Sequence, residues 1–293
     1  MLKSQPGDPE ITKALARALH ASGYSERAID LLESFTHRFP SAVDLTTVNM
    51  QAELYMLGAR WGDTISLIDG HLNSEDGTSF TTGQIAQVPP DLAAKRGICL
   101  LYLGRKDEAF HILDEGLLCE DEVNGLEDLF AEVAQALAAS AEYKKAIGVY
   151  NRLREDAPEY DQEALWVKLA ACYEKANDAE SAADLYAQVL QNSPSNLEAR
   201  LELARIWYSW QDYGNSFPRT TEAISLLDWF SSNRRALNAQ ETKRVAEAYT
   251  ELECERRALD MLLPLARRSL ANQVVKHTSM SQLPPLLTTT SRL

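Results

Sequence analysis

The stretch that most constrains the fold is residues 163–194, EALWVKLAACYEKANDAESAADLYAQVLQNSP. Its large and small apolar residues and its final proline recur at fixed spacing: Trp166, Leu169, Ala170, Tyr173, Ala182, Tyr186 and Pro194. This spacing predicts two short helices that cross in a hairpin. The small residues Ala170 and Ala182 would lie where the backbones approach most closely, and the aromatic residues would fill the space around them. Pro194 would end the second helix, because proline has no N–H to donate and clashes with the preceding turn.

The pattern resembles the tetratricopeptide repeat, with alanine for the usual glycine and tyrosine for the usual phenylalanine. A single hairpin of this kind cannot bury its apolar face, so at least three must stack. Other parts of the chain repeat the spacing, since Ala16 and Ala28 are as far apart as Ala170 and Ala182. We therefore expect an all-α, right-handed superhelical solenoid of about seven tetratricopeptide hairpins over residues 1–270.

Two segments depart from this pattern. Residues 73–88 (NSEDGTSFTTGQIAQV) are polar and rich in Gly, Ser and Thr, so we expect an exposed insertion between helices. After residue 270 the apolar pattern stops, and residues 271–293 are expected to form a disordered or truncated tail. Solenoids usually close with a polar capping helix. None is expected here, so we expect the chain to be a piece of a longer scaffold or to be capped by a partner.

Composition narrows the class of protein. The formal net charge is −14, which disfavours direct binding of this segment to the DNA phosphate backbone. The four cysteines are far apart and form no C-x-x-C pair, so reduced thiols in an intracellular protein are expected. The N-terminus has no apolar signal region, and the longest apolar runs are too short to span a bilayer.

No motif indicates catalysis, and we expect neither a cofactor nor a metal site. The five histidines are scattered over the chain without an H-x-x-x-H pair, and phosphate-binding and nucleophile motifs are missing. Acidic residues decorate every helix, and Glu33, Glu53 and Glu132 are expected on solvated faces. A helical-array enzyme is the less favoured alternative from another functional class.

A tetratricopeptide scaffold would bind its partners through the first helices of adjacent hairpins. Helix phase alone suggests five candidate groove residues: Gln135, Ala171, Glu174, Arg205 and Tyr208. Co-chaperone repeats hold a carboxylate with a clamp of basic residues. The exposed positions of the first helices are mixed and mostly not basic here, which weakens that alternative.

The order of segments is more specific than the repeat itself. DLTTVNMQAELYMLGARWGDTISLI precedes the polar insertion, and VPPDLAAKRGICLLYLG, LEDLFAEVAQAL and YKKAIGVYNRL follow it. This order resembles the tetratricopeptide subunit of transcription factor IIIC, over about residues 11–210. The resemblance implies a nuclear scaffold without catalytic residues that contacts other factor IIIC subunits, factor IIIB and RNA polymerase III. A scaffold of a ubiquitin-ligase or chaperone assembly remains an alternative with the same fold.

Overall fold

The computed structural model describes residues 8–76, 88–118, 123, 125–156, 161–209, 219–232 and 237–280. In these residues all regular structure is helical, with fourteen α-helices and one short 3-10 helix, Pro40–Ala42. The α-helices are α1 (Pro9–Ala21), α2 (Ser25–Arg38), α3 (Leu45–Leu57), α4 (Trp61–Asp76), α5 (Pro90–Tyr102), α6 (Lys106–Gly116), α7 (Glu127–Ala139), α8 (Tyr143–Asp156), α9 (Gln162–Lys175), α10 (Ala179–Asn192), α11 (Leu197–Ser209), α12 (Thr220–Ser232), α13 (Ala239–Glu251) and α14 (Glu255–Met280).

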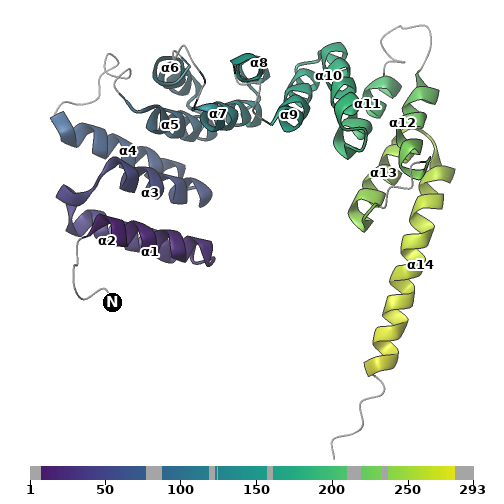
Figure 1. Cartoon of the computed structure of the whole chain (residues 1–293), viewed down its shortest axis with the longest axis horizontal. Helices are drawn as coiled ribbons and strands as arrows, with labels where there is room; N and C mark the ends of the chain where they lie inside the picture. The colour runs from purple at the N-terminus through teal and green to yellow at the C-terminus, as the bar shows by residue number, and fades with distance from the viewer. Residues whose placement is uncertain are drawn as a thin grey trace, which may run out of the picture. The chain divides into compact units, whose positions relative to one another are not determined.

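The helices follow one another as hairpins (Figure 1). Contacts join α1 to α2, α3 to α4, α5 to α6, α7 to α8, α11 to α12 and α13 to α14. A turn of three residues joins α9 to α10. The expected all-α repeat fold of about seven hairpins is therefore confirmed in the described part of the chain. The right-handed superhelical turn stays a prediction.

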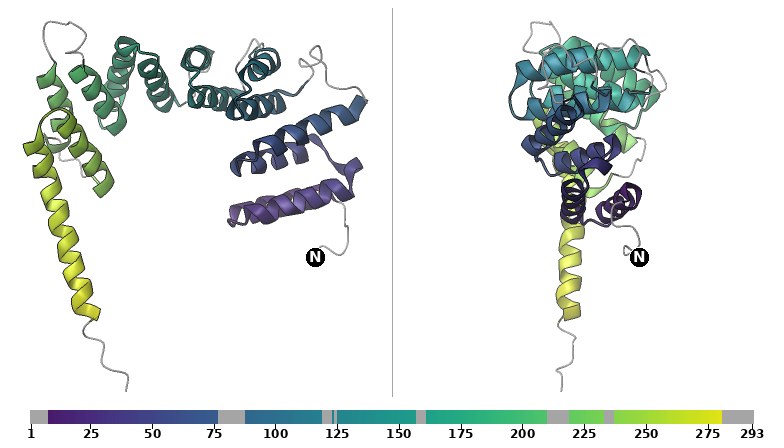
Figure 2. Two further views of the ribbon diagram at one scale, coloured as in Figure 1. Left: turned by 180° about the vertical axis from the view of Figure 1, so that it is seen from behind. Right: turned by 90° about the vertical axis from the view of Figure 1, so that its left-hand side faces the viewer.

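The chain divides into two compact units, which we call unit 1 (Met1–Leu165) and unit 2 (Trp166–Leu293). Within unit 1, successive hairpins pack through α2 and α3 and through α4 and α5. Figures 1 and 2 show the hairpin of α1 and α2 next to the hairpin of α3 and α4. Within unit 2, α10 packs on α11 and α12 packs on α13. Each unit thus builds its own core from neighbouring hairpins.

Six of the hairpins turn in the same way. Each has one residue with a left-handed backbone between its helices: Gly23, Ala59, Gly104, Ala141, Asn177 and Glu253, with φ between 55° and 83°. In every case the next residue donates its N–H to a carbonyl five residues earlier, at 2.8–2.9 Å. This is the Schellman arrangement, which satisfies the last carbonyl groups of a helix. The residue in the left-handed conformation is glycine in only two of the six turns, so four turns carry backbone strain.

That strain predicts a gain in stability. Ala141 has φ of 61°, a conformation that costs a residue with a Cβ atom roughly 1–2 kcal/mol. We expect Ala141→Gly to raise the free energy of unfolding by about 0.5–1 kcal/mol, the remainder being lost to the entropy of glycine in the unfolded chain. Urea denaturation followed by circular dichroism measures this. The control Ala139→Gly, in the last turn of α7, should lower the free energy of unfolding instead.

A small residue recurs near the middle of each first helix. The residues at this position of the seven first helices are all buried: Ala16, Ala52, Gly97, Ala134, Ala170, Ala204 and Ala246. In the signature stretch, Leu169, Ala170 and Ala182 are fully buried and Tyr186 is almost so. Trp166 and Tyr173 are partly buried, and Pro194 lies in the turn that follows α10. The helical residues of the signature are therefore buried or partly buried, and their packing around the helix crossing stays a prediction.

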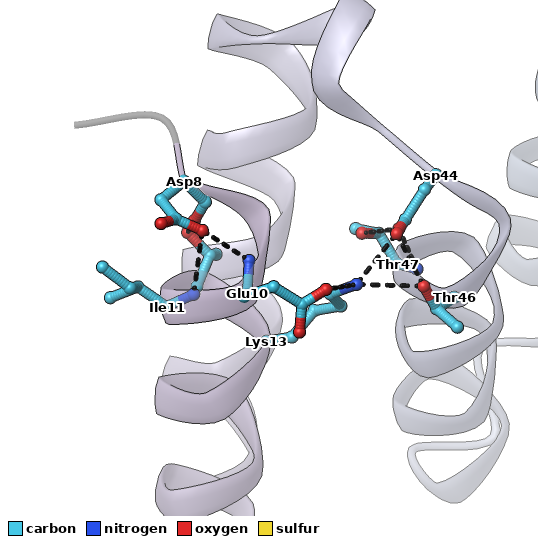
Figure 3. Close-up of polar contacts among 8 residues, drawn as sticks. Asp8, Glu10, Ile11, Lys13, Asp44, Thr46 and Thr47 are labelled. Carbon is cyan, nitrogen blue, oxygen red and sulfur yellow. Dashed lines mark hydrogen bonds and ion pairs between the residues drawn. The ribbon is translucent and has the colours of Figure 1, made fainter. Parts of the chain in front are cut away.

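First helices also contact one another, as α1 with α3 and α11 with α13. A buried ammonium group joins the first two of them (Figure 3). Lys13 on α1, whose side chain is 4% exposed, donates to Asp44 at 2.8 Å and to Thr46 at 3.0 Å, and pairs with Glu10 at 2.6 Å. These three contacts match the three N–H donors of the ammonium group. Burial alone would raise the pKa of Asp44, but hydrogen bonds from Lys13 and its neighbouring threonines hold that pKa well below its usual value.

A carboxyl whose pKa is lowered by folding stabilises the fold above its unfolded pKa of about 3.9, and this contribution is lost as the pH falls through its folded pKa. Asp44 also caps α3. Because asparagine is an equally good cap, Asp44→Asn removes the charge and keeps the cap. We expect this change to lower the free energy of unfolding by about 1–2 kcal/mol at pH 7, a modest loss because the Asp44 side chain is 46% exposed. Near pH 3 the loss should be smaller, because the carboxyl group is then largely protonated in the unfolded chain. Denaturation at both pH values measures the difference. Asp8→Asn, the same change at the cap of α1, should alter stability by less than about 0.5 kcal/mol.

Two helices extend beyond the expected limits. Helix α4 continues to Asp76, inside the segment 73–88 that we expected to be an insertion, and residues 77–87 lie outside the described part of the chain. Helix α14 continues to Met280, ten residues into the expected tail. The loss of apolar periodicity does not end a helix that is already formed, and residues 271–280 contain neither Gly nor Pro. The expected tail beyond Met280 lies outside the described residues, and the domain limits stay predictions.

Candidate functional site

The first helices of unit 1 form a groove of about 720 Å³, which we call the unit 1 groove. Helices α3, α5 and α7 line it, together with the first residue of α4. These helices are aligned because α3 contacts α5 and α5 contacts α7. The stacking of hairpins therefore brings side chains from three repeats to one surface.

Four carboxylates line the unit 1 groove: Glu53, Asp91, Asp128 and Glu132. Lys95 is the one cationic side chain among its described lining residues, and it is buried beside Glu53, with Nζ and Oε1 3.3 Å apart. Partial burial raises the pKa of Glu132, and the nearby carboxylates of Glu53, Asp128 and Asp91 act in the same direction, against the effect of Lys95. Carboxylates therefore outnumber cationic side chains among the described lining residues of this groove.

The same groove has an apolar and aromatic wall. Trp61, at the start of α4, stacks on Tyr102, at the end of α5, with ring centroids 4.5 Å apart and planes 12° apart. Tyr102 itself is 45% exposed, and Leu57, which lines the same groove, is 69% exposed. Exposed aromatic and aliphatic side chains next to charged groups are typical of surfaces that bind other proteins.

Unit 2 has a second groove, of about 530 Å³, formed by the turn between α9 and α10 and by α11. Glu174 and Arg205 both line it. Arg205 also forms ion pairs with Glu202, at 2.7 Å, and with Glu251 of α13, at 2.6 Å. Burial raises the pKa of Glu202, and Arg205 opposes this. The one cationic side chain among the described lining residues of this groove is thus paired with two carboxylates of unit 2.

The five candidate groove residues are placed as follows. Gln135 is exposed and lines the unit 1 groove. Glu174 and Arg205 both line the groove of unit 2. Among the described residues, Ala171 and Tyr208 do not line that groove; both are partly buried, and Tyr208 packs on the apolar cluster formed by α11 to α14. Whether any of the five contacts a partner stays a prediction.

The sequence pattern does not indicate the carboxylates of the unit 1 groove as a group. Glu53 and Glu132 were expected on solvated faces, and they line the groove. One signal was present, because Asp91 and Asp128 occupy the same position in successive repeats, six residues before Gly97 and Ala134 respectively. The aromatic pair had no such signal, since Trp61 belongs to a second helix and Tyr102 to the next hairpin.

Two of the described thiols lie in environments that keep them unreactive. Burial raises the pKa of the Cys99 and Cys172 thiols to about 11, so both stay protonated near neutral pH. In the described residues, no three His, Cys, Asp or Glu side chains are grouped so that they could hold a metal ion. No described helix combines the length and apolar character that crossing a membrane needs.

Comparison with known sequences matches the repeat and a class of relatives. A family model described as Tetratricopeptide repeat matches residues 163–206. Human General transcription factor 3C polypeptide 3 is 26% identical over 220 residues, which cover 69% of this chain and 24% of that protein. The Transcription factor tau 131 kDa subunit of Saccharomyces cerevisiae is 26% identical over 125 residues, 43% of this chain and 12% of that protein. The chain is thus similar to tetratricopeptide subunits of transcription factor IIIC, as expected. The match spans about a quarter of the human relative's length and a smaller share of the yeast relative's length.

Solved structures support the fold. The C-terminal part of a TPR repeat-containing protein from Cytophaga hutchinsonii matches with a TM-score of 0.58 and 14% identity, over 86% of this chain and 94% of that chain. A tetratricopeptide repeat protein from Parabacteroides merdae matches with a TM-score of 0.55 and 10% identity, over 92% and 96% of the two chains. At these identities the likeness establishes the tetratricopeptide fold alone.

Proposed function

We propose that this chain is a nuclear protein-binding scaffold of a transcription factor IIIC complex. It holds other factor IIIC subunits and helps to assemble factor IIIB and RNA polymerase III at promoters. The observation that carries the proposal is the similarity to two transcription factor subunits, one human and one yeast, over 220 and 125 residues of this chain. The remaining length of those relatives has no counterpart here, so the chain would supply one portion of such a scaffold.

The surfaces of the two units support a binding role. In unit 1 the grooved face carries charged and aromatic side chains from three successive first helices. In unit 2 the groove contains Glu174 and Arg205, from two successive first helices. Repeat proteins use such surfaces, which extend across several repeats, to bind other polypeptides. No chemical step is needed for this role.

Affinity capture tests the proposal. The tagged chain is incubated with nuclear extract, and the bound proteins are identified by mass spectrometry. We expect recovery of other factor IIIC subunits, with factor IIIB or polymerase III components in smaller amounts. Recovery of chaperones or ubiquitin-ligase subunits in their place would contradict the proposal and leave the fold unchanged.

A pair of tyrosine variants tests the candidate residues on unit 2. Tyr208→Ala should reduce recovery of the captured subunits several-fold if Tyr208 anchors a partner. Tyr24→Ala is the matched control, because Tyr24 lies in the first hairpin turn and is 54% exposed. Circular dichroism must show that both variants keep the helical content of the parent chain. Equal recovery with both variants would remove Tyr208 from the binding surface.

A further inference from the structure

Each second helix has a large apolar residue four places after a buried alanine or threonine, and in the last of these helices this residue is exposed. In the other six hairpins it is at most 1% exposed: Leu32, Ile68, Leu113, Tyr150, Tyr186 and Leu227. The corresponding residue of α14, four places after Ala258, is Leu262, which is 37% exposed. Leu259 and Leu263 lie on the same side of α14 and are 58% and 47% exposed. We call these three leucines, 259, 262 and 263, the α14 face.

The first helices show a matching difference, two places after the small residue near the middle of each helix. In six of them the residue at this position is at most 4% exposed: Leu54, Cys99, Ala136, Cys172, Ile206 and Ala248. In α1 the corresponding residue is Ala18, which is exposed. On the same side of α1, Ile11 is 43% exposed and Ala14 is also exposed. We call Ile11, Ala14 and Ala18 the α1 face.

Two core clusters show what covers these two positions elsewhere in the chain. Leu32 of α2 and Leu54 of α3 belong to one cluster, and Leu227 of α12 and Ala248 of α13 belong to the other. In both cases the second helix of one hairpin shares a core with the first helix of the next hairpin, and the helices are in contact. No described helix follows α14 or precedes α1. The α14 face and the α1 face are therefore the two halves of such a junction.

We propose that two copies of this chain associate head to tail, with the α14 face of one copy packed on the α1 face of the other. This contact repeats, between molecules, the junction that joins successive hairpins within one molecule. Because the two faces are different, a pair of copies keeps one unused α14 face and one unused α1 face, to which further copies can add.

A second pair of positions at the junctions is polar within the chain. At the junction of α2 and α3, Tyr55 donates a hydrogen bond to Glu33 at 2.8 Å. At the junction of α12 and α13, Tyr249 donates a hydrogen bond to Asp228 at 2.7 Å. The tyrosine is three places after the small residue of its first helix, and the carboxylate is five places after the small residue of its second helix. In these junctions a hydroxyl donor on one helix thus faces an acceptor on the other.

The same two positions are apolar on α1 and α14, where they hold Leu19 and Leu263. Leu263 is 47% exposed and has no side-chain acceptor. A first helix with tyrosine at this position would bury its hydroxyl against Leu263 without a carboxylate, and a buried polar group without a partner costs free energy. Leu19 would instead pack on Leu263. The apolar residue on α14 is thus matched by an apolar residue on α1, which favours a second copy of this chain as the occupant.

Analytical ultracentrifugation of the purified full chain tests the proposal. We expect the weight-average mass to exceed the mass of one chain and to rise with concentration, because a head-to-tail contact between different faces does not close in a pair. The mass of one chain at every concentration would overturn the proposal and would leave the α14 face for a helix of another protein.

Single substitutions locate the contact. Leu262→Glu and Ala18→Glu each place a carboxylate in the apolar contact, so each variant alone should associate roughly tenfold more weakly than the parent chain, or less. Both residues are exposed in the single chain, and circular dichroism with thermal unfolding checks that the helices persist. Leu57→Glu is the matched control, because Leu57 is an exposed leucine of α3 that belongs to neither face. It should associate as the parent chain does, and equal weakening in the control would contradict the assigned faces.

A mixture of the two variants decides whether the contact is head to tail. The Leu262→Glu chain keeps its α1 face and the Ala18→Glu chain keeps its α14 face, so one chain of each kind can pair and no third chain can add. We expect the equimolar mixture to form a dimer and nothing larger, at a concentration where each variant alone is monomeric. A mixture that stays monomeric while the parent chain associates would overturn the proposal. The purified chain is sufficient for these measurements, so their outcome is separate from that of the nuclear-extract capture.

Discussion

Replacing Tyr186 with alanine should lower the free energy of unfolding by about 3–5 kcal/mol, the usual cost of deleting a buried aromatic side chain. Tyr186 lies on α10 and is 1% exposed, in the core of the signature hairpin. Burial raises the pKa of its hydroxyl, and the charges of nearby glutamates raise it further, so the phenol stays neutral in the ordinary pH range. The measurement is urea denaturation followed by circular dichroism.

The matched variant is Tyr186→Phe, which deletes only the hydroxyl and restores the residue usual at this position of the repeat. It should change stability by less than about 1 kcal/mol. In a repeat protein the two units can unfold in separate transitions. If they do, the alanine variant should shift the transition of unit 2, which contains Tyr186. Equal effects of alanine and phenylalanine would show that the ring does not stabilise this hairpin by packing.

Replacing Gly97 with alanine should destabilise the third hairpin by about 1–3 kcal/mol, although alanine is the better helix former. A Cβ atom built on Gly97 would lie 2.5 Å from Cγ and Cδ2 of Leu113 on α6. Either Leu113 must leave its rotamer or the two helices must separate. Gly148→Ala is the matched control, because Gly148 lies inside α8 with open space around it. That change should stabilise the chain by about 0.5–1 kcal/mol.

A double variant shows whether the clash is the cause. Leu113→Ala alone should cost about 2–5 kcal/mol, since Leu113 is 1% exposed. Combined with Gly97→Ala it should cost less than the sum of the two single changes, because the new methyl group fills part of the vacated space. Denaturation of all three variants measures these costs. If the cost of the double change equals the sum of the two single costs, the effect of Gly97→Ala does not arise from a clash with Leu113.

The repeat fold was predictable because its determinants are local. Ala170 and Ala182 belong to one hairpin and are twelve residues apart, and a short turn leaves such a pair few ways to pack. The same reasoning located Ala16 and Ala28, and all four residues are fully buried. Hairpins with this spacing therefore specify their own helices and core positions without reference to the rest of the chain.

Helix limits were less predictable, since they depend on how far a helix continues once packing has started it. No breaker residue follows the apolar pattern of α14 before Met280, and the helix extends there although the pattern has ended. The sequence shows the helix propensity of residues 271–280 and their lack of Gly and Pro. It does not show whether these two features outweigh the loss of apolar periodicity.

The sequence by itself determined the all-α class, about seven hairpins and the alanines of the signature hairpin, because these follow from spacings within a single repeat. Only the tertiary structure decided what the grooves contain. Lys95 meets Glu53, and Trp61 stacks on Tyr102, across residues that are about forty apart along the chain. Such contacts depend on the rotation of one hairpin on the next, and side-chain packing between repeats sets that rotation. The unit 1 groove is a product of this stacking, and no single repeat contains it.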